Sequence, residues 1–251
     1  AACDGYFAGS IEERAADFLA MLRDDCVKAI LCSYGGYGCV HLLPRIGDEI
    51  ARFPKWIIGM SDCSALLAAW ASGGVMGLHA VQCRHLAKKG ESKSSEFLRE
   101  TLFGWLPHYS TPAHPLNRTG EATGTIVGGN LSVLASLINT PYDILKTGNI
   151  LFIEDINEPL YKIERMLYTL KFSGVLGSLK GLVVGNFEGC RENAAFGGSV
   201  YDVIRRMVQE YDYPVCMGMP FGHIGMENRA LILGRKTTLN ITPNGNVTIE
   251  Q

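Results

Sequence analysis

The amino-acid sequence predicts an α/β fold, in which a parallel-sheet N-terminal domain is followed by a C-terminal α+β domain rich in β-structure. Three observations predict it. Short apolar segments alternate with helical ones at the start of the chain, which is typical of a parallel sheet with helices on both faces. Prolines and charged residues interrupt this alternation between residues 84 and 119. Beyond residue 120 the alternation resumes, and the chain closes on three segments with the pattern of strands.

The first domain is expected over residues 1–85, and residues 86–119 are expected to form a linker. The first helix begins after Ser10, which forms a capping box with Glu13, because each side chain can accept a hydrogen bond from the backbone N–H of the other residue. In chain order we expect a helix over 11–22, a strand over 27–32, a helix before Pro54, a strand over 56–58 and a helix over 64–71.

The second domain is expected over residues 120–251. Apolar residues at helical spacing predict an amphipathic helix over 160–170. The other expected helices are a short one in the linker at 96–102, one at 130–138 and one at 200–211. Strands are expected at 125–127, 149–153, 182–184, 230–233, 237–241 and 246–249, the last three as a β-meander whose final hairpin turns on Asn244-Gly245.

Composition and charge narrow the classes of function. Hydrophobic residues make up 47% of the 251 and charged residues 19%, which suits a packed core. The net charge is −2 and no basic stripe is present, so we expect no nucleic-acid partner. Residues 63–83 lack Asp, Glu, Lys and Arg, but Gly73-Gly74 divides them, which favours a buried helix followed by a strand and no membrane partner. The function that remains is chemistry on a small molecule or a peptide.

The cysteines indicate a reducing compartment. There are eight, at positions 3, 26, 32, 39, 63, 83, 190 and 216, and no C-x-x-C pair is among them. Several lie in apolar runs, where cysteine acts as a small buried hydrophobe. We therefore expect reduced structural thiols, a cytoplasmic protein and no metal site.

Three places share one arrangement, in which a short apolar strand ends and a glycine-rich or reactive element follows. Ligands of open α/β sheets bind at the carboxyl ends of strands, so the three places can converge there. The first is Gly35-Gly36-Tyr37-Gly38, whose bare N–H groups suit a phosphate or an oxyanion. His41 interrupts a G-x-G-x-x-G fingerprint, which disfavours a dinucleotide, and a plain tight turn is the alternative.

The second place is Ser61, followed by Asp62, directly after the strand over 56–58. A serine on a sharp strand-to-helix turn exposes its hydroxyl, and the next N–H can stabilise an oxyanion. The alternative is that Ser61 or Asp62 only caps the helix that follows.

The third place pairs Glu154, at the end of the strand over 149–153, with His223. A serine nucleophile needs a base, and the base needs an orienting carboxylate. The alternatives are a helix cap for Glu154 and a structural role for His223.

These motifs together resemble the LD-carboxypeptidase family of serine peptidases over essentially the whole chain. The matching segments are Asp4–Ser10, Gly35–Gly38 with Leu42-Leu43-Pro44, Ile58–Asp62, Gly128–Leu131, Leu151–Asp155 and Phe221–His223. The resemblance implies a triad of Ser61 as nucleophile, His223 as base and Glu154 as its orienting acid. It also implies an oxyanion hole from the backbone of Asp62 and of Gly35-Gly36, with Tyr37 beside it in the substrate site, and no cofactor.

The chain departs from the family pattern at several positions. Tyr34 and His41 stand where the family usually has arginine, and His79-Ala80-Val81 stands where His-Gly-Pro is common. The family also opens with a further strand, helix and strand before the Tyr6 region, which this sequence lacks. We therefore expect a truncated flavodoxin-like first domain with an uncovered strand edge. Any signal sequence would lie in that additional N-terminal segment.

The resemblance implies hydrolysis of the bond between an L-diamino acid and D-Ala in peptidoglycan tetrapeptides, as part of cell-wall recycling, with a homodimer as a further expectation. One alternative is a microcin-immunity-type peptidase that cleaves acyl-adenylate-like peptides, with Trp105 stacking on the nucleobase, although Trp105 also suits a core or lid position. Another is a muropeptide-binding remnant without turnover. Of the acids near residue 154, we expect Glu154 to reach His223, and Asp155 or Glu158 to favour the start of the helix over 160–170.

Overall fold

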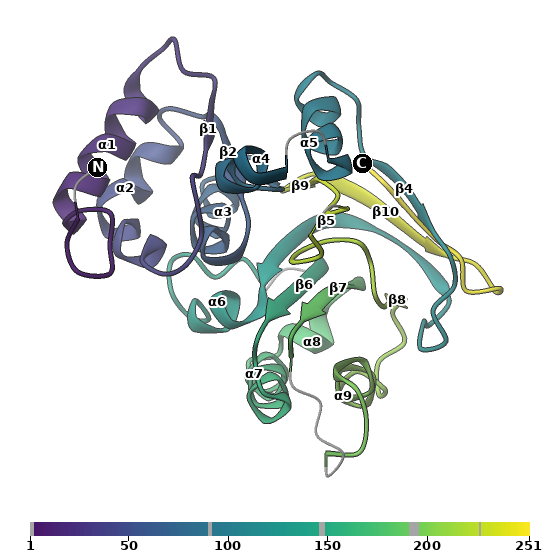
Figure 1. Cartoon of the computed structure of the whole chain (residues 1–251). Coiled ribbons are helices and arrows are strands. Elements are labelled where there is room, and N and C mark those ends of the chain that lie inside the picture. Colours follow the sequence, from purple (N-terminus) through teal and green to yellow (C-terminus); the bar gives the residue numbers. More distant parts are fainter. Residues whose placement is uncertain (1–2, 90–91, 146–148, 191–195, 226) are drawn as a thin grey trace.

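The computed structural model of the protein describes residues 3–89, 92–145, 149–190, 196–225 and 227–251. Its strands form two sheets, one with the order β1-β2-β3-β9 and one with the order β4-β11-β10-β5-β6-β7-β8. Helices pack against both sheets (Figure 1). The predicted α/β fold class is therefore confirmed.

The N-terminal part alternates strands and helices as expected. Its elements are α1 (Ile11–Arg23), β1 (Ala29–Leu31), the 3₁₀ turn η1 (Cys39–His41), α2 (Leu43–Ile50), β2 (Trp56–Gly59), the 3₁₀ turn η2 (Ser61–Cys63), α3 (Ser64–Ser72), β3 (Gly77–His79) and α4 (Cys83–Lys89). Strands β1, β2 and β3 are parallel neighbours. The capping box of Ser10 and Glu13 is present at the start of α1.

The fourth strand of this sheet comes from the far end of the chain. Strand β9 (Leu231–Leu233) pairs with β3 in antiparallel orientation. The expected three-stranded meander is therefore wrong for its first strand, and the first sheet is not purely parallel. All three residues of β9 are buried, so the segment needs cover on both faces, which an exposed meander would not give it.

The second sheet combines a parallel and an antiparallel part. Its strands are β4 (His108–Thr111), β5 (Gly120–Asn130), β6 (Ile150–Ile156), β7 (Gly181–Glu188), β8 (Val215–Cys216), β10 (Lys236–Ile241) and β11 (Val247–Glu250). Strands β5 to β8 are parallel, whereas β10, β11 and β4 add to β5 in antiparallel fashion. The expected linker thus contributes β4 to this sheet.

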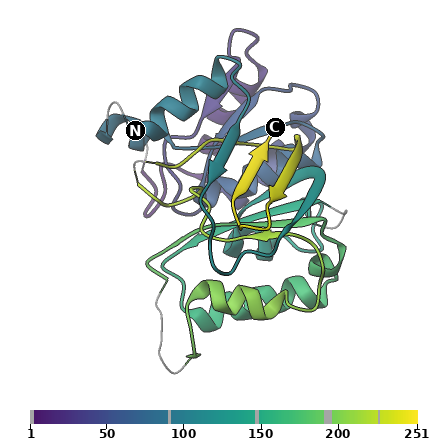
Figure 2. The ribbon, with the colours of Figure 1, turned by 90° about the vertical axis from the view of Figure 1, so that its right-hand side faces the viewer.

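The remaining described helices are α5 (Lys93–Leu102), α6 (Leu131–Ser136), α7 (Leu160–Phe172), α8 (Val175–Ser178) and α9 (Val200–Met207). Figure 2 shows α7 and α9 on the side of the second sheet that faces away from the N-terminal part. Within the described residues, none of the helices combines the length and the apolar character that crossing a membrane requires.

The register of β6 decides which side chains face the N-terminal part. Ile150 and Phe152 pack in one core cluster with residues of α3, whereas Leu151 and Ile153 pack in another with residues of α7 and α9. Side chains alternate between the two faces of a strand. Glu154 therefore continues the face of Phe152, toward the N-terminal part.

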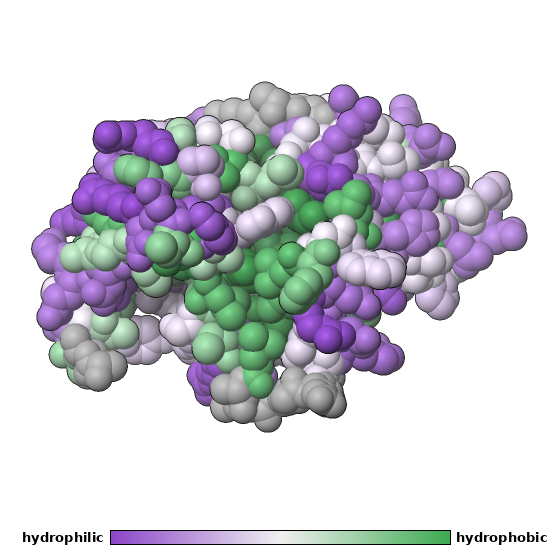
Figure 3. Space-filling model, turned by 90° about the horizontal axis from the view of Figure 1, so that it is seen from above, coloured by the Kyte–Doolittle hydropathy of each residue, from purple (hydrophilic) through white to green (hydrophobic). Residues whose placement is uncertain are grey.

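Strand β1 lies at the edge of the first sheet, and its outer side has no partner strand among the described residues. A third apolar cluster, which includes Ile58 and Leu78, covers one face of this sheet, and Leu31 and Trp56 pack against it while only partly buried. Seen from above, hydrophobic residues gather in the middle of the molecule (Figure 3). The expected uncovered strand edge is thus present.

Candidate active site

Ser61 lies on a strained turn between β2 and α3. Its φ angle is 61°, in the left-handed region that side-chain-bearing residues rarely adopt. Such strain is typical of a serine that a strand-to-helix turn holds out toward a reaction centre. No side chain caps η2 or α3, so the alternative in which Ser61 or Asp62 is merely a helix cap is not supported. The Asp62 carboxylate instead accepts a hydrogen bond from the Cys39 N–H at 2.8 Å.

The glycine-rich turn lies directly beside Ser61. Gly35 and Ser61 follow the neighbouring parallel strands β1 and β2. A Cβ atom on Gly35 would be 3.0 Å from the Ser61 Cβ and 3.2 Å from its Oγ. The Gln82 side chain donates to the Met60 carbonyl at 2.8 Å, which holds the turn just before Ser61. Convergence of these two motifs at the carboxyl edge of one sheet is confirmed.

Glu154 and His223 are in direct contact, 2.6 Å between Oε2 and Nδ1. Burial alone would raise the pKa of the fully buried Glu154 carboxyl, but the hydrogen bond from His223, together with the nearby His79 and the charge of both rings, lowers it to about 2. Burial likewise acts to lower the pKa of His223, and the hydrogen bond and charge of Glu154 outweigh it and raise that pKa. Glu154 is therefore an anion at neutral pH and favours the protonated imidazole.

A glycine permits this approach. Gly222 has a φ angle of 99°, and a Cβ atom there would be 2.7 Å from the Glu154 Oε2. Any side chain at this position would push the carboxylate away from His223. The close approach of Glu154 thus explains why a glycine precedes His223 in the Phe221-Gly222-His223 motif.

His79 is a residue of the site that the sequence did not predict. It is completely buried at the end of β3, and its Nε2 is 3.9 Å from the Glu154 Oε1. Its ring packs edge-on against Phe152, with 4.9 Å between ring centres. Glu154 therefore lies between two imidazoles. The only sequence signal was a histidine at a strand end, in the segment that departs from the family pattern.

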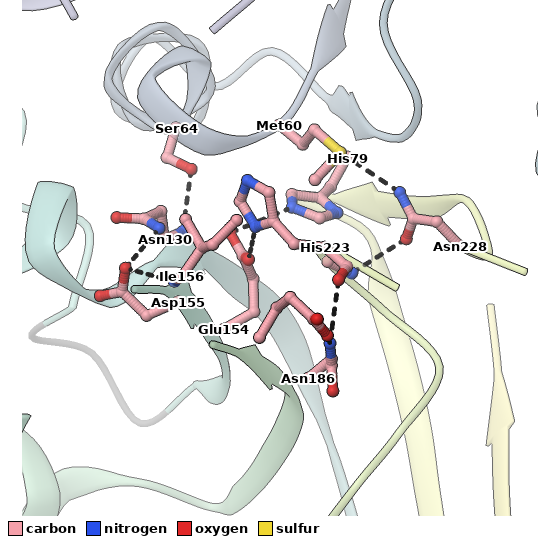
Figure 4. A network of polar contacts seen from close by, with 12 residues as sticks. Met60, Ser64, His79, Asn130, Glu154, Asp155, Ile156, Asn186, His223 and Asn228 are labelled. Atoms are coloured by element: carbon pink, nitrogen blue, oxygen red, sulfur yellow. Dashed lines mark hydrogen bonds and ion pairs between the residues drawn. The ribbon is translucent and has the colours of Figure 1, made fainter. Parts of the chain in front are cut away.

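Two asparagines fix the loop that carries His223 (Figure 4). Asn186 donates to the His223 carbonyl at 2.9 Å. Asn228 accepts from the Gly222 N–H at 2.9 Å and donates to the Met60 sulfur at 3.4 Å. Asn228 thus connects the His223 loop to the residue before Ser61, across the two halves of the site.

Asp155 serves a different helix from the one expected. Its carboxylate accepts from the Asn130 side chain and from the Ser132 N–H, both at 2.9 Å, so it supports the start of α6. Of the two acids expected to favour the start of α7, Asp155 therefore does not, whereas Glu158 pairs with Lys162 of that helix at 3.6 Å, and neither acid caps it. The cause is the register of β6, which turns Asp155 to the face opposite Glu154. Burial and, less strongly, the Glu154 charge raise the pKa of Asp155 to about 6.

Arginines pack against Tyr34 and His41, the two positions at which the family usually has arginine. The Arg84 guanidinium lies over the Tyr34 ring, 4.3 Å from its centre. Arg14 lies 3.4 Å from the His41 Nδ1, and the other ring nitrogen of His41 is 3.3 Å from the Tyr37 hydroxyl. Tyr37, expected in the substrate site, is 55% exposed. Arg84 of α4 and Arg14 of α1 therefore place guanidinium groups beside the two positions where the family usually has arginine.

Trp105 lies apart from these contacts. It is 73% exposed and lines a cavity of about 330 Å³ together with Pro107, Tyr109 and Arg229. Within the described ranges no three His, Cys, Asp or Glu side chains are grouped so that they could hold a metal ion.

Comparison with known proteins agrees with this architecture. The model of the LD-carboxypeptidase N-terminal domain matches residues 1–80, and that of the C-terminal domain matches residues 123–239. A probable murein peptide carboxypeptidase of Bacillus subtilis is 34% identical over 94% of this chain and 76% of its own length. The crystal structure of muramoyltetrapeptide carboxypeptidase from Oxalobacter formigenes superposes with a TM-score of 0.89 at 27% identity, over 99% of this chain and 87% of that one.

The microcin C7 self-immunity protein MccF of Escherichia coli is also similar, with 26% identity over 88% of this chain and 73% of its own. Two sheets with the Glu154–His223 pair between them, together with these matches, define a peptidase of the carboxypeptidase type. The chain belongs to the LD-carboxypeptidase family.

Proposed function

We propose that the protein is a serine carboxypeptidase that hydrolyses the bond between the L-centre of a diamino acid and the terminal D-Ala of peptidoglycan tetrapeptides. In this proposal Ser61 is the nucleophile, His223 the base and Glu154 the acid that orients it. The reaction trims cell-wall fragments for recycling in the cytoplasm. The contact of 2.6 Å between Glu154 and His223 is the observation that carries the proposal, because it fixes the imidazole in one tautomer.

The chemistry follows from this tautomer. With Nδ1–H donated to Glu154, the Nε2 of His223 is free to take the proton of Ser61 as its Oγ attacks the scissile carbonyl. Backbone N–H groups of Asp62 and of the Gly35-Gly36 turn stabilise the oxyanion. The imidazolium then gives its proton to the amine of D-Ala, which leaves. Water, deprotonated by His223, hydrolyses the acyl-enzyme and releases the tripeptide.

The direct test is mass spectrometry of a muramoyl tetrapeptide incubated with the purified protein. We expect the substrate to lose the mass of one alanine residue and free D-Ala to appear. A pentapeptide and a tetrapeptide ending in L-Ala serve as controls for position and stereochemistry. Release of any residue other than the terminal D-Ala would contradict the proposal.

One observation favours a second substrate class. Trp105 is exposed beside a cavity that Arg229 also lines, and an aromatic face with a nearby cation suits a nucleotide-like group. The similarity to MccF points the same way. An acyl-sulfamoyl adenosine competitor in the tetrapeptide assay separates the two: inhibition that depends on Trp105 would favour the microcin-immunity type.

Arg84 is expected to hold the free carboxylate of the substrate. It is exposed, and its stack on Tyr34 keeps the guanidinium beside the turn that begins at Gly35. Replacement Arg84→Gln should raise KM while kcat changes little, because a charge-assisted hydrogen bond contributes about 1.5–3 kcal/mol, on the order of 10- to 100-fold. Steady-state kinetics on the tetrapeptide measure both constants.

The matched control for Arg84 is Arg165→Gln on α7. Arg165 also stacks on a tyrosine, Tyr161, at 5.6 Å. However, α7 covers the face of the second sheet that points away from the N-terminal part and therefore away from Ser61. Equal KM values for the wild type and the Arg84 variant would show that another group holds the carboxylate.

A further inference from the structure

Two cysteine side chains meet next to the Ser61 turn. Cys63 closes η2, two residues after Ser61, and is completely buried. Cys32 directly follows β1, and its N–H bonds to the Ile58 carbonyl of β2 at 2.9 Å. A Cβ atom built on Gly59 would be 2.8 Å from the Cys63 Cβ and 3.3 Å from the Cys32 Cβ. The two Cβ atoms therefore lie within about 6 Å of each other, and a disulfide between them requires them to approach to about 3.8 Å.

The surroundings of Cys63 favour its thiolate. The neighbouring thiols of Cys32 and Cys39 lower the pKa of Cys63, and so does the Gln82 amide, which donates to the Cys63 sulfur at 3.4 Å. The pKa values of Cys32 and Cys39 are raised in return, mainly by their hydrogen bonds to Cys63. A thiolate is the form that reacts with oxidants, so Cys63 is the nucleophile of the pair.

The partly exposed Cys32 and the buried Cys63 both line a cavity of about 580 Å³. Its other walls include Phe7 of the N-terminal segment, Phe18 of α1 and Tyr34. Hydrogen peroxide is scarcely larger than water and fits such a space. The remaining cysteines differ: burial raises the pKa of Cys216 to about 12 and that of Cys190 to about 11, while Cys3, Cys26 and Cys83 are exposed.

We infer that Cys63 and Cys32 form a peroxide-sensitive pair that closes to a disulfide and stops turnover at Ser61. In the first step the Cys63 thiolate attacks hydrogen peroxide; an S–O bond forms, the O–O bond breaks and hydroxide leaves. In the second step the Cys32 sulfur, after losing its proton, attacks the Cys63 sulfenic acid; the S–S bond forms, the S–O bond breaks and hydroxide leaves. With the protons counted, two thiols and one peroxide give one disulfide and two waters.

The effect on turnover follows from the position of Cys63. An S–S bond of about 2.05 Å is much shorter than a contact between two separate thiols. Closing it draws Cys63 toward Cys32 and leaves the Cys63 sulfur without a proton to donate to the Tyr34 carbonyl, which is now 3.8 Å away. Ser61 belongs to the same 3₁₀ turn and must shift with it. This consequence rests on the proposed serine mechanism, whereas the disulfide does not.

Peptide mapping tests the disulfide without an activity assay. The purified full chain is treated with a small excess of hydrogen peroxide, blocked with N-ethylmaleimide and digested with trypsin. Cleavage after Lys28, Arg45, Lys55 and Arg84 places Cys32 with Cys39 in one peptide and Cys63 with Cys83 in another. A Cys39→Ala, Cys83→Ala background removes this ambiguity and should still give the linked peptide, which dithiothreitol separates.

Adding Cys32→Ala to that background is the matched comparison. The link should disappear, and dimedone should then label Cys63 as its sulfenic acid. Maleimide labelling of Cys32 and Cys63 that peroxide leaves unchanged, or earlier oxidation of the exposed Cys3 and Cys26, would overturn the pair. Disulfide formation with undiminished cleavage of the tetrapeptide would overturn the regulatory role. Absence of cleavage before peroxide is added concerns only the proposed function, since the mapping still decides the disulfide.

Discussion

Replacement Ser61→Ala should abolish cleavage of the tetrapeptide while binding stays close to that of the wild type. The hydroxyl is the only group of this side chain that the proposed mechanism uses, and loss of the nucleophile from comparable triads lowers turnover on the order of 10⁶-fold. Cleavage is followed by mass spectrometry and binding by calorimetry on the uncut substrate. A chelator should leave the wild-type rate unchanged, because the proposed steps use side chains and backbone N–H groups alone.

Ser64→Ala is the matched control. It makes the same replacement three residues later, where the Ser64 hydroxyl accepts a hydrogen bond from the Asn130 N–H at 2.9 Å. Leaving that buried N–H unpaired should cost about 1–3 kcal/mol of stability and little turnover. If the Ser61 variant cleaved normally and chelation stopped the wild type, the serine mechanism would be refuted.

Glu154→Gln should keep the fold and lower kcat on the order of 10⁴-fold, as the corresponding change does in other triads that lose the preferred tautomer. A glutamine amide can donate to His223 where the carboxylate only accepts. The imidazole would then present the wrong nitrogen, or the wrong protonation state, to Ser61. Circular dichroism and a thermal melt show whether the protein remains folded.

The pH profile gives an independent readout. His223 must be neutral to act as a base, so kcat/KM of the wild type should fall as the pH drops through the pKa of His223, which Glu154 raises above its ordinary value. Without the Glu154 charge, burial of the imidazole prevails and lowers that pKa. The acid limb of the residual activity of Glu154→Gln should therefore move to lower pH. An unmoved limb would mean that Glu154 does not control His223.

Asp155→Asn is the neighbouring control for this carboxylate. An amide in place of the carboxylate would direct a donor at the Ser132 N–H or at the Asn130 side chain, at a cost of about 1–3 kcal/mol in stability. Turnover at a temperature below the melt should be nearly unchanged. A dead Asp155 variant with the melting temperature of the wild type would reverse the assignment of the two acids.

On the β6 side of the site, periodicity separates Glu154 from Asp155, and the family resemblance was needed to select Glu154 as the acid that reaches His223. The apolar run before them indicates a strand, and alternation then sends the two carboxylates to opposite faces. The turns at Gly35 and Ser61 were predictable for a similar reason, since each follows a short apolar strand. Pairing Glu154 with His223 depended on the family resemblance, because no spacing rule joins residues so far apart.

Other features left no such signal. A buried histidine such as His79 and a buried amide such as Asn228 act through tertiary neighbours, and their positions in the sequence show no period. The β9 segment reads equally well as a meander strand, and only burial on both faces places it beside β3. The stack of Arg84 on Tyr34 depends on how α4 leaves the first sheet.

The pairing of β3 with β9 also constrains how the molecule is made. The first sheet joins His79 to Leu231, so its last strand is available only after all the elements between these two residues have left the ribosome. Contacts between residues so distant in sequence slow folding, because a long loop must close before they are gained. Until then β3 presents an open edge to other nascent chains. The same late step brings in the loop with His223, so an incomplete chain would have His79 near Glu154 but would lack the imidazole that Glu154 contacts at 2.6 Å.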